Sequence, residues 1–222
     1  MKKSFCIILA IVLFVSQASA FAVNSSSDVS ANIALTIEDI DSMGNYSISE
    51  LKVLFPEAQL SVAQEENVRK NMDEEGTLPL SLTKNAIPVQ EFEHEFEDGS
   101  KTYLKVYADG SRSSSGFSLG TETNYLNGYR YTDTYVYQDY GIFYQTFKVT
   151  HDYGDYNQVV STKEHYWGLS GQRQGNKGGV GSGYIEQVVA FNAYEPNLGW
   201  VYAGTYGLRF TCYPLGANVY TY

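Results

Sequence analysis

An alternating run of tyrosines between residues 128 and 156 constrains the fold of this chain more than any other feature. The run reads GYRYTDTYVYQDYGIFYQTFKVTHDYGDY and holds eight of the twenty tyrosines. Its first half places aromatic and acidic residues on odd positions: Tyr129, Tyr131, Asp133, Tyr135, Tyr137 and Asp139. Because successive side chains of a strand point to opposite faces, this spacing predicts an aromatic stripe on one face of a sheet.

A turn and a second alternating run follow the stripe. The sequence Gln-Asp-Tyr-Gly at 138–141 is typical of a turn, and Phe143, Phe147 and Val149 then share one face. We therefore predict a long β-hairpin. Its odd-numbered face is our candidate for recognition, and the three apolar residues are assigned to the core.

Short alternating segments broken by glycine and aspartate extend over residues 85–222, and nineteen of the twenty tyrosines lie from Tyr103 onward. Predicted strands recur about every 8–15 residues with turn signals between them, as in antiparallel sandwiches and barrels. They include a hairpin turning at residues 98–100, with Glu97 expected opposite Lys101 and Phe92 opposite Val106, and a closing pair of strands at 200–206 and 208–213. No strand alternates with a long helix, so a parallel α/β fold is not favoured. We predict an all-β fold, an antiparallel β-sandwich or barrel of about 8–10 strands, preceded by a short acidic helical segment.

The beginning of the chain has the pattern of a secretory signal peptide. A basic start (MKK) precedes an apolar run over residues 5–15, and Ala-Ser-Ala at 18–20 is a small-residue cleavage signal. We expect cleavage after Ala20, with Ala22 as the next choice, and a secreted, extracellular mature protein. The apolar run is shorter than the roughly 20 residues of a membrane-spanning helix.

An acidic, helix-like region separates the signal peptide from the β region. Residues 21–34 lack any period and are predicted to be a flexible tether. Residues 35–84 contain a capping box formed by Ser47 and Glu50, and a stretch at 57–75 that reads as either a solvated helix or a disordered segment. The thin apolar stripe of that stretch consists of Leu60, Val68 and Met72. We interpret 35–84 as a spacer, an intramolecular cover or a propeptide.

Charge is concentrated in the first part of the mature chain. Residues 21–98 hold sixteen acids and four bases, whereas residues 99–222 hold nine of each. Nucleic acids and anionic lipids are attracted by clustered Lys and Arg, which this sequence lacks. We therefore expect no nucleic-acid partner and, after signal removal, no stable membrane span.

Cys212 is the single cysteine left once the signal peptide is removed, so a disulfide framework is excluded. Leu208, Phe210 and Cys212 share one face of a predicted strand. We assign the thiol to the core and not to a catalytic nucleophile.

One motif in the acidic segment has the spacing of a calcium loop. Residues 39–50 read DIDSMGNYSISE, with acids at the first and third positions, glycine at the sixth, serine at the ninth and glutamate at the twelfth. This stretch resembles an EF-hand or dockerin calcium loop. The resemblance implies calcium ligands at Asp39, Asp41, Asn45, Ser47 and Glu50. Met43 at the fifth position offers no side-chain oxygen, and two short capped helices explain the same residues, so both interpretations stay open. No other cofactor is expected.

Two His-carboxylate pairs flank the predicted turn at Gly154. A hairpin there would bring His151 or Asp152 near Glu164 or His165, and such groups can serve acid–base catalysis, glycoside cleavage or a partial metal site. They support an alternative function as a secreted hydrolase of glycans or peptides.

The glycine-rich stretch at 168–183, GLSGQRQGNKGGVGSG, lacks the Gly-Lys-Ser/Thr of a phosphate-binding loop. We predict a flexible hairpin loop over a rigid sheet, a position from which loops often contribute to recognition.

The aromatic stripe itself favours recognition, because a phenol ring has a flat apolar face and a polar tip. Our first hypothesis is a secreted, bacterial, non-enzymatic β-sandwich binding module that recognises a glycan or a protein surface. The candidate binding residues are Tyr129, Tyr131, Tyr135, Tyr137, Trp167 and Trp200. A plain soluble sheet surface is the competing interpretation. A bacteriocin-like or pore-forming toxin is a third, weaker alternative.

Overall fold

The computed structural model describes residues 46–167, 171–195, 199–214 and 216–222. Within these ranges only the backbone is described for residues 171–177, 191–195 and 199–203. The predicted signal peptide and tether lie outside the described residues. All described residues belong to one compact unit, so the acidic helices and the β-strands are not separate bodies.

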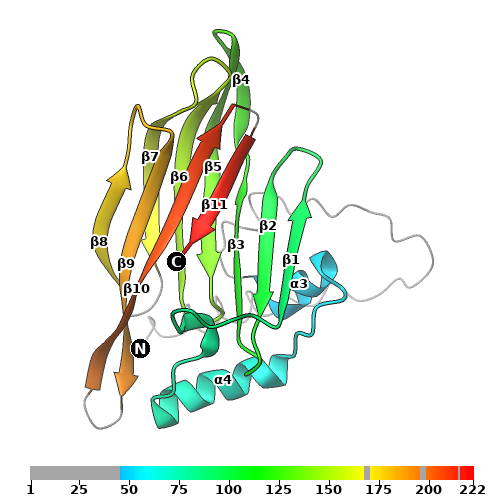
Figure 1. Ribbon diagram of the computed structural model, residues 1–222, viewed down its shortest axis with the longest axis vertical. Helices are drawn as coiled ribbons and strands as arrows, with labels where there is room; N and C mark the ends of the chain where they lie inside the picture. Colours follow the sequence, from blue (N-terminus) through cyan, green and yellow to red (C-terminus); the bar gives the residue numbers. More distant parts are fainter. Residues whose placement is uncertain (1–45, 168–170, 196–198, 215) are drawn as a thin grey trace, which may run out of the picture. The chain divides into compact units, whose positions relative to one another are not determined.

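Two α-helices, a 3-10 turn and eleven strands make up the described part of the chain (Figure 1). The helices are α3 (Ile48–Leu54) and α4 (Val62–Glu75), and the 3-10 turn is η1 (Leu80–Leu82). The strands are β1 (Gln90–Glu95), β2 (Lys101–Val106), β3 (Arg112–Ser118), β4 (Thr121–Tyr125), β5 (Gly128–Asp139), β6 (Tyr144–Tyr153), β7 (Gln158–Trp167), β8 (Gly171–Gly178), β9 (Tyr184–Glu195), β10 (Gly199–Tyr213) and β11 (Gly216–Thr221).

The strands form two antiparallel sheets. The seven-stranded sheet has the order β1-β2-β3-β5-β6-β7, with β4 also paired to β5, and the four-stranded sheet has the order β11-β10-β9-β8. Neither sheet closes on itself. The predicted all-β antiparallel class is therefore confirmed, as a sandwich and not as a barrel.

The two sheets pack face to face through a common apolar core. The seven-stranded sheet contributes Phe117, Val136, Phe147, Val149 and Val159, and the four-stranded sheet contributes Ile185, Leu208, Phe210, Cys212 and Val219. The predicted core positions Phe147, Val149 and Cys212 are confirmed. Burial raises the pKa of the Cys212 thiol to about 12, which keeps it protonated and unreactive.

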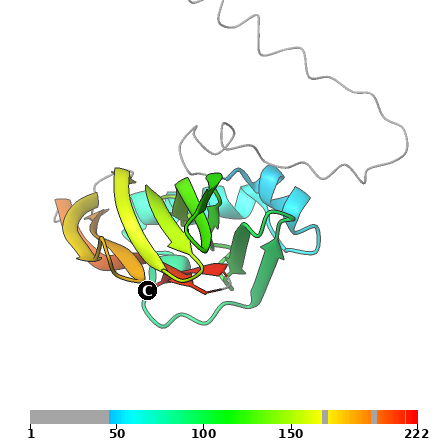
Figure 2. The same ribbon diagram turned by 90° about the horizontal axis from the view of Figure 1, so that it is seen from above.

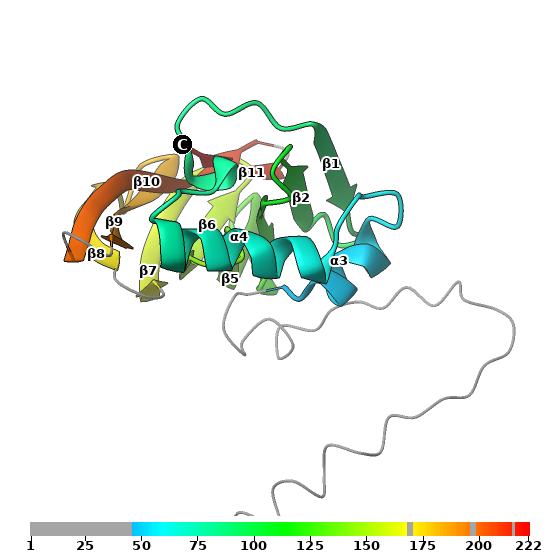
Figure 3. The same cartoon turned by 90° about the horizontal axis from the view of Figure 1, so that it is seen from below.

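Helices α3 and α4 lie on the other side of the seven-stranded sheet and across the ends of its strands (Figures 2 and 3). Ser47 caps α3 through the predicted capping box with Glu50, and Gly76 ends α4 in a left-handed conformation. The apolar side of α3 packs on β2 and β5 through Leu51, which is fully buried. The stretch at 57–75 is therefore largely helical, and the acidic segment has the position of an intramolecular cover.

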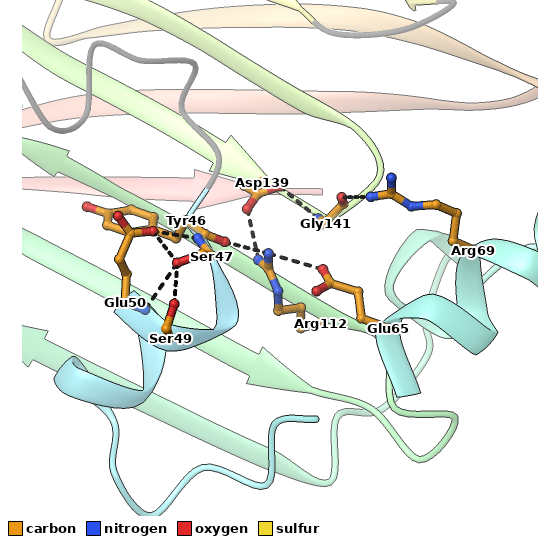
Figure 4. Close-up of polar contacts among 9 residues, drawn as sticks. All are labelled: Tyr46, Ser47, Ser49, Glu50, Glu65, Arg69, Arg112, Asp139 and Gly141. Atoms are coloured by element: carbon orange, nitrogen blue, oxygen red, sulfur yellow. Dashed lines mark hydrogen bonds and ion pairs between the residues drawn. The ribbon is translucent and has the colours of Figure 1, made fainter. Parts of the chain in front are cut away.

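A buried ionic network fastens this cover to the sheet (Figure 4). The Arg112 guanidinium on β3 donates to the Asp139 carboxylate at 2.8 Å, to the Tyr46 carbonyl oxygen at 2.6 Å, and lies 3.2 Å from the Glu65 carboxylate of α4. Arg69, also on α4, donates to the carbonyl oxygen of Gly141 in the β5–β6 turn. One arginine thus connects the beginning of α3, the body of α4 and two strands.

Three local expectations are corrected by the strand pairing. The predicted closing pair of strands at 200–206 and 208–213 is the single strand β10, which pairs with β9 over residues 199–211 and with β11 over residues 208–213. Within the predicted glycine loop, residues 171–178 form strand β8. In the β1–β2 hairpin, Phe92 pairs with Leu104, whereas the turn pattern predicts a register shifted by two residues that keeps the same faces.

Candidate binding surface

A β-bulge divides the predicted tyrosine stripe into two halves. The pairing of β5 with β6 shifts between Tyr131 and Thr134, and Asp133 has a left-handed φ of 64°. The break between β3 and β4 lies opposite this point, because Ser118 pairs with Tyr135 and Thr121 with Thr132. A bulge inserts one extra residue, so the alternation beyond it moves to the other face of the sheet.

The second half of the stripe is buried beneath α3. Tyr135 and Tyr137 are 5% and 1% exposed, and the ring centroid of Tyr46 lies 5.3 Å from that of Tyr137. The Tyr137 hydroxyl donates to the Thr102 hydroxyl at 2.9 Å, and burial raises its pKa well above the ordinary value. The exposure expected for these two rings is not observed, because the helical segment covers the face that the alternation leaves open.

The first half of the stripe lies on the opposite face, at the end of the sheet. Tyr129 is exposed, whereas the Tyr131 ring stacks on His151 with centroids 5.5 Å apart and its hydroxyl bonds to Glu122. Trp167 is partly buried beside the cluster around Phe143, and the side chain of Trp200 lies outside the described part of the chain. The six predicted binding residues therefore do not share one surface.

His151 is a core residue and not a surface base. It is fully buried, its Nε2 is 2.9 Å from the Thr134 hydroxyl, and its ring centroid is 4.8 Å from that of Phe210. Loss of hydration on burial lowers its pKa to about 3, so the imidazole is neutral at physiological pH.

The other members of the predicted catalytic group are held apart by the strand register. His151 pairs with Val159 and Asp152 with Gln158, while Lys148, three residues before His151, pairs with Lys163. The remaining side chains have separate partners: Asp152 binds Arg130 at 2.7 Å, Glu164 binds Lys148 at 2.7 Å, and His165 bonds to Gln187 at 2.7 Å. The contacts of these four residues thus run to different neighbours.

The calcium-loop prediction falls mostly on undescribed residues. Asp39, Asp41 and Asn45 lie outside the described part of the chain. Ser47 and Glu50 bond to each other in the cap of α3, with the Glu50 carboxylate 2.6 Å from the Ser47 nitrogen (Figure 4). Among the residues that the structure describes, no group of three or more His, Cys, Asp or Glu side chains is placed to hold a metal ion.

An exposed group of tyrosines lies instead on the outer face of the four-stranded sheet. Leu208, Phe210 and Cys212 point into the core, so the residues between them on β10 point outward, as do alternate residues of β9 and β11. We call this surface the C-terminal tyrosine face. It consists of Tyr184, Glu186, Arg209, Tyr213, Tyr220 and Tyr222. In Figure 1 strands β9, β10 and β11 lie in front of the seven-stranded sheet, with this face toward the reader.

A charge pair forms the polar centre of the face. The Arg209 Nε and Nη2 donate to one oxygen of Glu186 at 2.8 and 2.6 Å, and the Tyr222 hydroxyl donates to the other. The guanidinium carbon also lies 4.8 Å from the centroid of the Tyr184 ring. Glu186 is fully buried by these neighbours, so its charge is compensated and its position is fixed.

The exposed rings are fixed as well. The hydroxyls of Tyr213 and Tyr220 are 2.6 Å apart, and that hydrogen bond raises the pKa of Tyr213. Tyr222 lies over Gly207, where any Cβ would overlap its ring, and the two residues exchange backbone hydrogen bonds. These three rings remain 41–55% exposed. The surface therefore offers ring faces to solvent at little further cost in side-chain entropy.

The residues of this face were missed in the sequence, although a signal was present. Arg209, Thr211 and Tyr213 alternate with the recognised core triplet around Phe210. Asn218, Tyr220 and Tyr222 alternate in the same way at the end of the chain. The binding face was predicted at residues 128–156 because tyrosines are more closely spaced there.

No protein-family model, curated protein or solved structure matches the chain. Among the helices that the structure describes, none is both long and apolar enough to cross a membrane. Function must therefore be argued from the geometry of the surface itself.

Proposed function

We propose that this protein is a secreted, bacterial, non-enzymatic binding module that holds a glycan chain against the C-terminal tyrosine face. The observation that carries the proposal is the combination of exposure and fixation in Tyr213, Tyr220 and Tyr222. Rings that are already immobilised lose little freedom when a ligand stacks on them.

The chemistry of the face suits a sugar. Each ring face is apolar and can cover the C–H face of a pyranose, while the neighbouring polar groups can bond to its hydroxyls. Arg209 and Thr211 lie beside the rings on the same side of the sheet and supply a guanidinium and a hydroxyl.

The test is retention of the mature protein on immobilised glycans and cell-wall polysaccharides. The double substitution Tyr213→Ala with Tyr220→Ala should abolish retention and leave the melting temperature close to wild type, because both side chains are at the surface. Tyr166→Ala is the matched control, since Tyr166 is similarly exposed but lies on β7 of the other sheet.

Two outcomes would reject the proposal. In one, the wild-type protein is retained by none of the polysaccharides. In the other, the double variant is retained as well as wild type, which would assign any binding to a different surface.

A further inference from the structure

The hairpin formed by β4 and β5 ends in an exposed apolar tip. Among the strands that the structure describes, β4 pairs with β5 alone, and all five of its residues are exposed. Tyr125 pairs with Gly128, so Leu126 and Asn127 form a two-residue turn, at the end of the sheet away from α4 (Figure 1). Leu126 is 69% exposed.

Leu126 occupies a backbone conformation that a branched, bulky side chain rarely adopts. Its φ is 51°, in the left-handed region that glycine and asparagine tolerate best. The next two residues, Asn127 and Gly128, are the preferred pair for a two-residue hairpin turn. The chain nevertheless turns one residue earlier and places leucine at the strained position.

Contacts with the neighbouring β6–β7 turn hold the hairpin in this register. A Cβ on Gly128 would overlap the carbonyl oxygen of Tyr153, so this position requires glycine. The Asn127 side chain donates to Asp155 at 2.6 Å, and a Cβ on Gly154 would lie 2.7 Å from the Asn127 carbonyl oxygen. The two turns are thus clamped together, and the strained leucine projects from a rigid base.

The surroundings of Leu126 are amphipathic aromatic rings and acidic side chains. Tyr125 and Tyr129 flank the turn and are exposed, and Tyr156 is exposed in the adjoining β6–β7 turn. Arg130 lies 3.8 Å from the Tyr125 ring centroid and pairs with Asp152. Glu122 and Asp155 accept hydrogen bonds from the neutral side chains of Tyr131 and Asn127, so the negative charges of these two carboxylates are not balanced by those bonds. No lysine lies between residues 106 and 147, so the tip has no basic cluster for an anionic surface.

We propose that this tip inserts shallowly into a zwitterionic lipid bilayer. Leu126 enters the boundary of the acyl chains, and the tyrosines lie at the level of the headgroups, where amphipathic aromatic rings are favoured. The polar body of β4 stays in water, which limits the depth to the last turn. A convex tip fits a deformable interface, and the strained turn is retained because it presents leucine outward.

The test is flotation of the mature protein with phosphatidylcholine vesicles. Wild type should float with the vesicles, and added salt should leave the bound fraction unchanged because no charge attraction is involved. Leu126→Asn should weaken partitioning roughly tenfold or more, since one buried leucine side chain is lost. The same variant should melt no lower than wild type, because asparagine suits the left-handed turn.

Val62→Asn is the matched control, because Val62 is 58% exposed at the beginning of α4, and α4 lies at the end of the sheet away from the tip (Figure 1). It should float like wild type, and so should the Tyr213→Ala, Tyr220→Ala double variant, which separates this proposal from glycan binding. The proposal is overturned if wild type does not float, if Leu126→Asn floats equally well, or if Val62→Asn loses as much binding as Leu126→Asn.

Discussion

Tyrosines have opposite positions on the two sheets of this sandwich. On the seven-stranded sheet, Tyr135 and Tyr137 lie beneath α3 and are core residues. On the four-stranded sheet, Tyr213 and Tyr220 alternate in the same way but stay at the surface. The difference is whether another part of the chain packs on that face. A tyrosine-rich alternation therefore identifies residues that share a face, and it does not say which face is covered.

The largest expected effect comes from removing a covered ring. Tyr137→Ala should lower the free energy of unfolding by about 3–5 kcal/mol, because it leaves a cavity and deprives Thr102 of its partner. Tyr220→Ala, the matched change on the open face, should shift it by less than about 0.5 kcal/mol. Urea denaturation measures both. Equal decreases in the free energy of unfolding for the two variants would show that both faces are buried, which would contradict the assignment of Tyr220 to the surface.

A somewhat smaller loss is expected from breaking the network that closes the covered face. Arg112→Met should destabilise the protein by about 3 kcal/mol, because the carboxylate of Asp139 is left buried without its cation. Burial already raises the pKa of Asp139, and removing Arg112 raises it further. The deficit relative to wild type should therefore shrink as pH falls and Asp139 takes up a proton.

Lys101→Met provides the control for this variant. Lys101 binds Glu93 and Glu95 at 2.9 and 2.8 Å on a half-exposed surface. Replacing Lys101 should lower the free energy of unfolding by less than about 1 kcal/mol. If Arg112→Met lowered the free energy of unfolding no more than Lys101→Met does, the cover would be held by apolar contacts alone.

The effect that is smallest at neutral pH is due to His151 in the core between the sheets, because it develops only as the pH falls. Its pKa is about 3 in the folded protein and 6.5 for an ordinary histidine. As the pH falls, the unfolded chain therefore takes up this proton before the folded protein does. The contribution of His151 to the free energy of unfolding is constant above about pH 6.5. Between pH 6.5 and 3 it falls by up to about 1.4 kcal/mol per pH unit. Unfolding free energies of wild type and His151→Gln, measured across this range, should converge at low pH. If the two free energies of unfolding changed with pH in parallel, the assignment of this pH dependence to His151 would be wrong.

Several elements of the fold could be read directly from the sequence. Alternation identified Phe147, Val149 and Cys212 as core residues, and the Ser47–Glu50 capping box marked the beginning of α3. These predictions rest on local rules, because a strand alternates every two residues and a helix cap involves residues three apart.

Other features depend on contacts between distant segments and had no local signal. The bulge at Asp133 moves Tyr135 to the other face from Tyr131, and the break between β3 and β4 accompanies it. The β1–β2 register was predicted by matching both faces of the hairpin, the charged pairs and the apolar pairs. It is shifted by two residues, which preserves the faces and leaves Lys101 opposite Glu95. The residues of the predicted catalytic group have separate partners for a similar reason, because the register of β6 and β7 could not be deduced from the turn between them.

The amino-acid sequence by itself determined the all-β antiparallel class, the apolar sides of β6 and of the second half of β10, and the capped beginning of α3. The tertiary structure decided which tyrosines are available to a partner. Tyr135 and Tyr137 are covered by helix residues some eighty positions earlier in the chain, while Tyr213, Tyr220 and Tyr222 have no such cover among the described residues. Periodicity is set by the local backbone, whereas burial is set by whichever distant segment gains most from packing on that face.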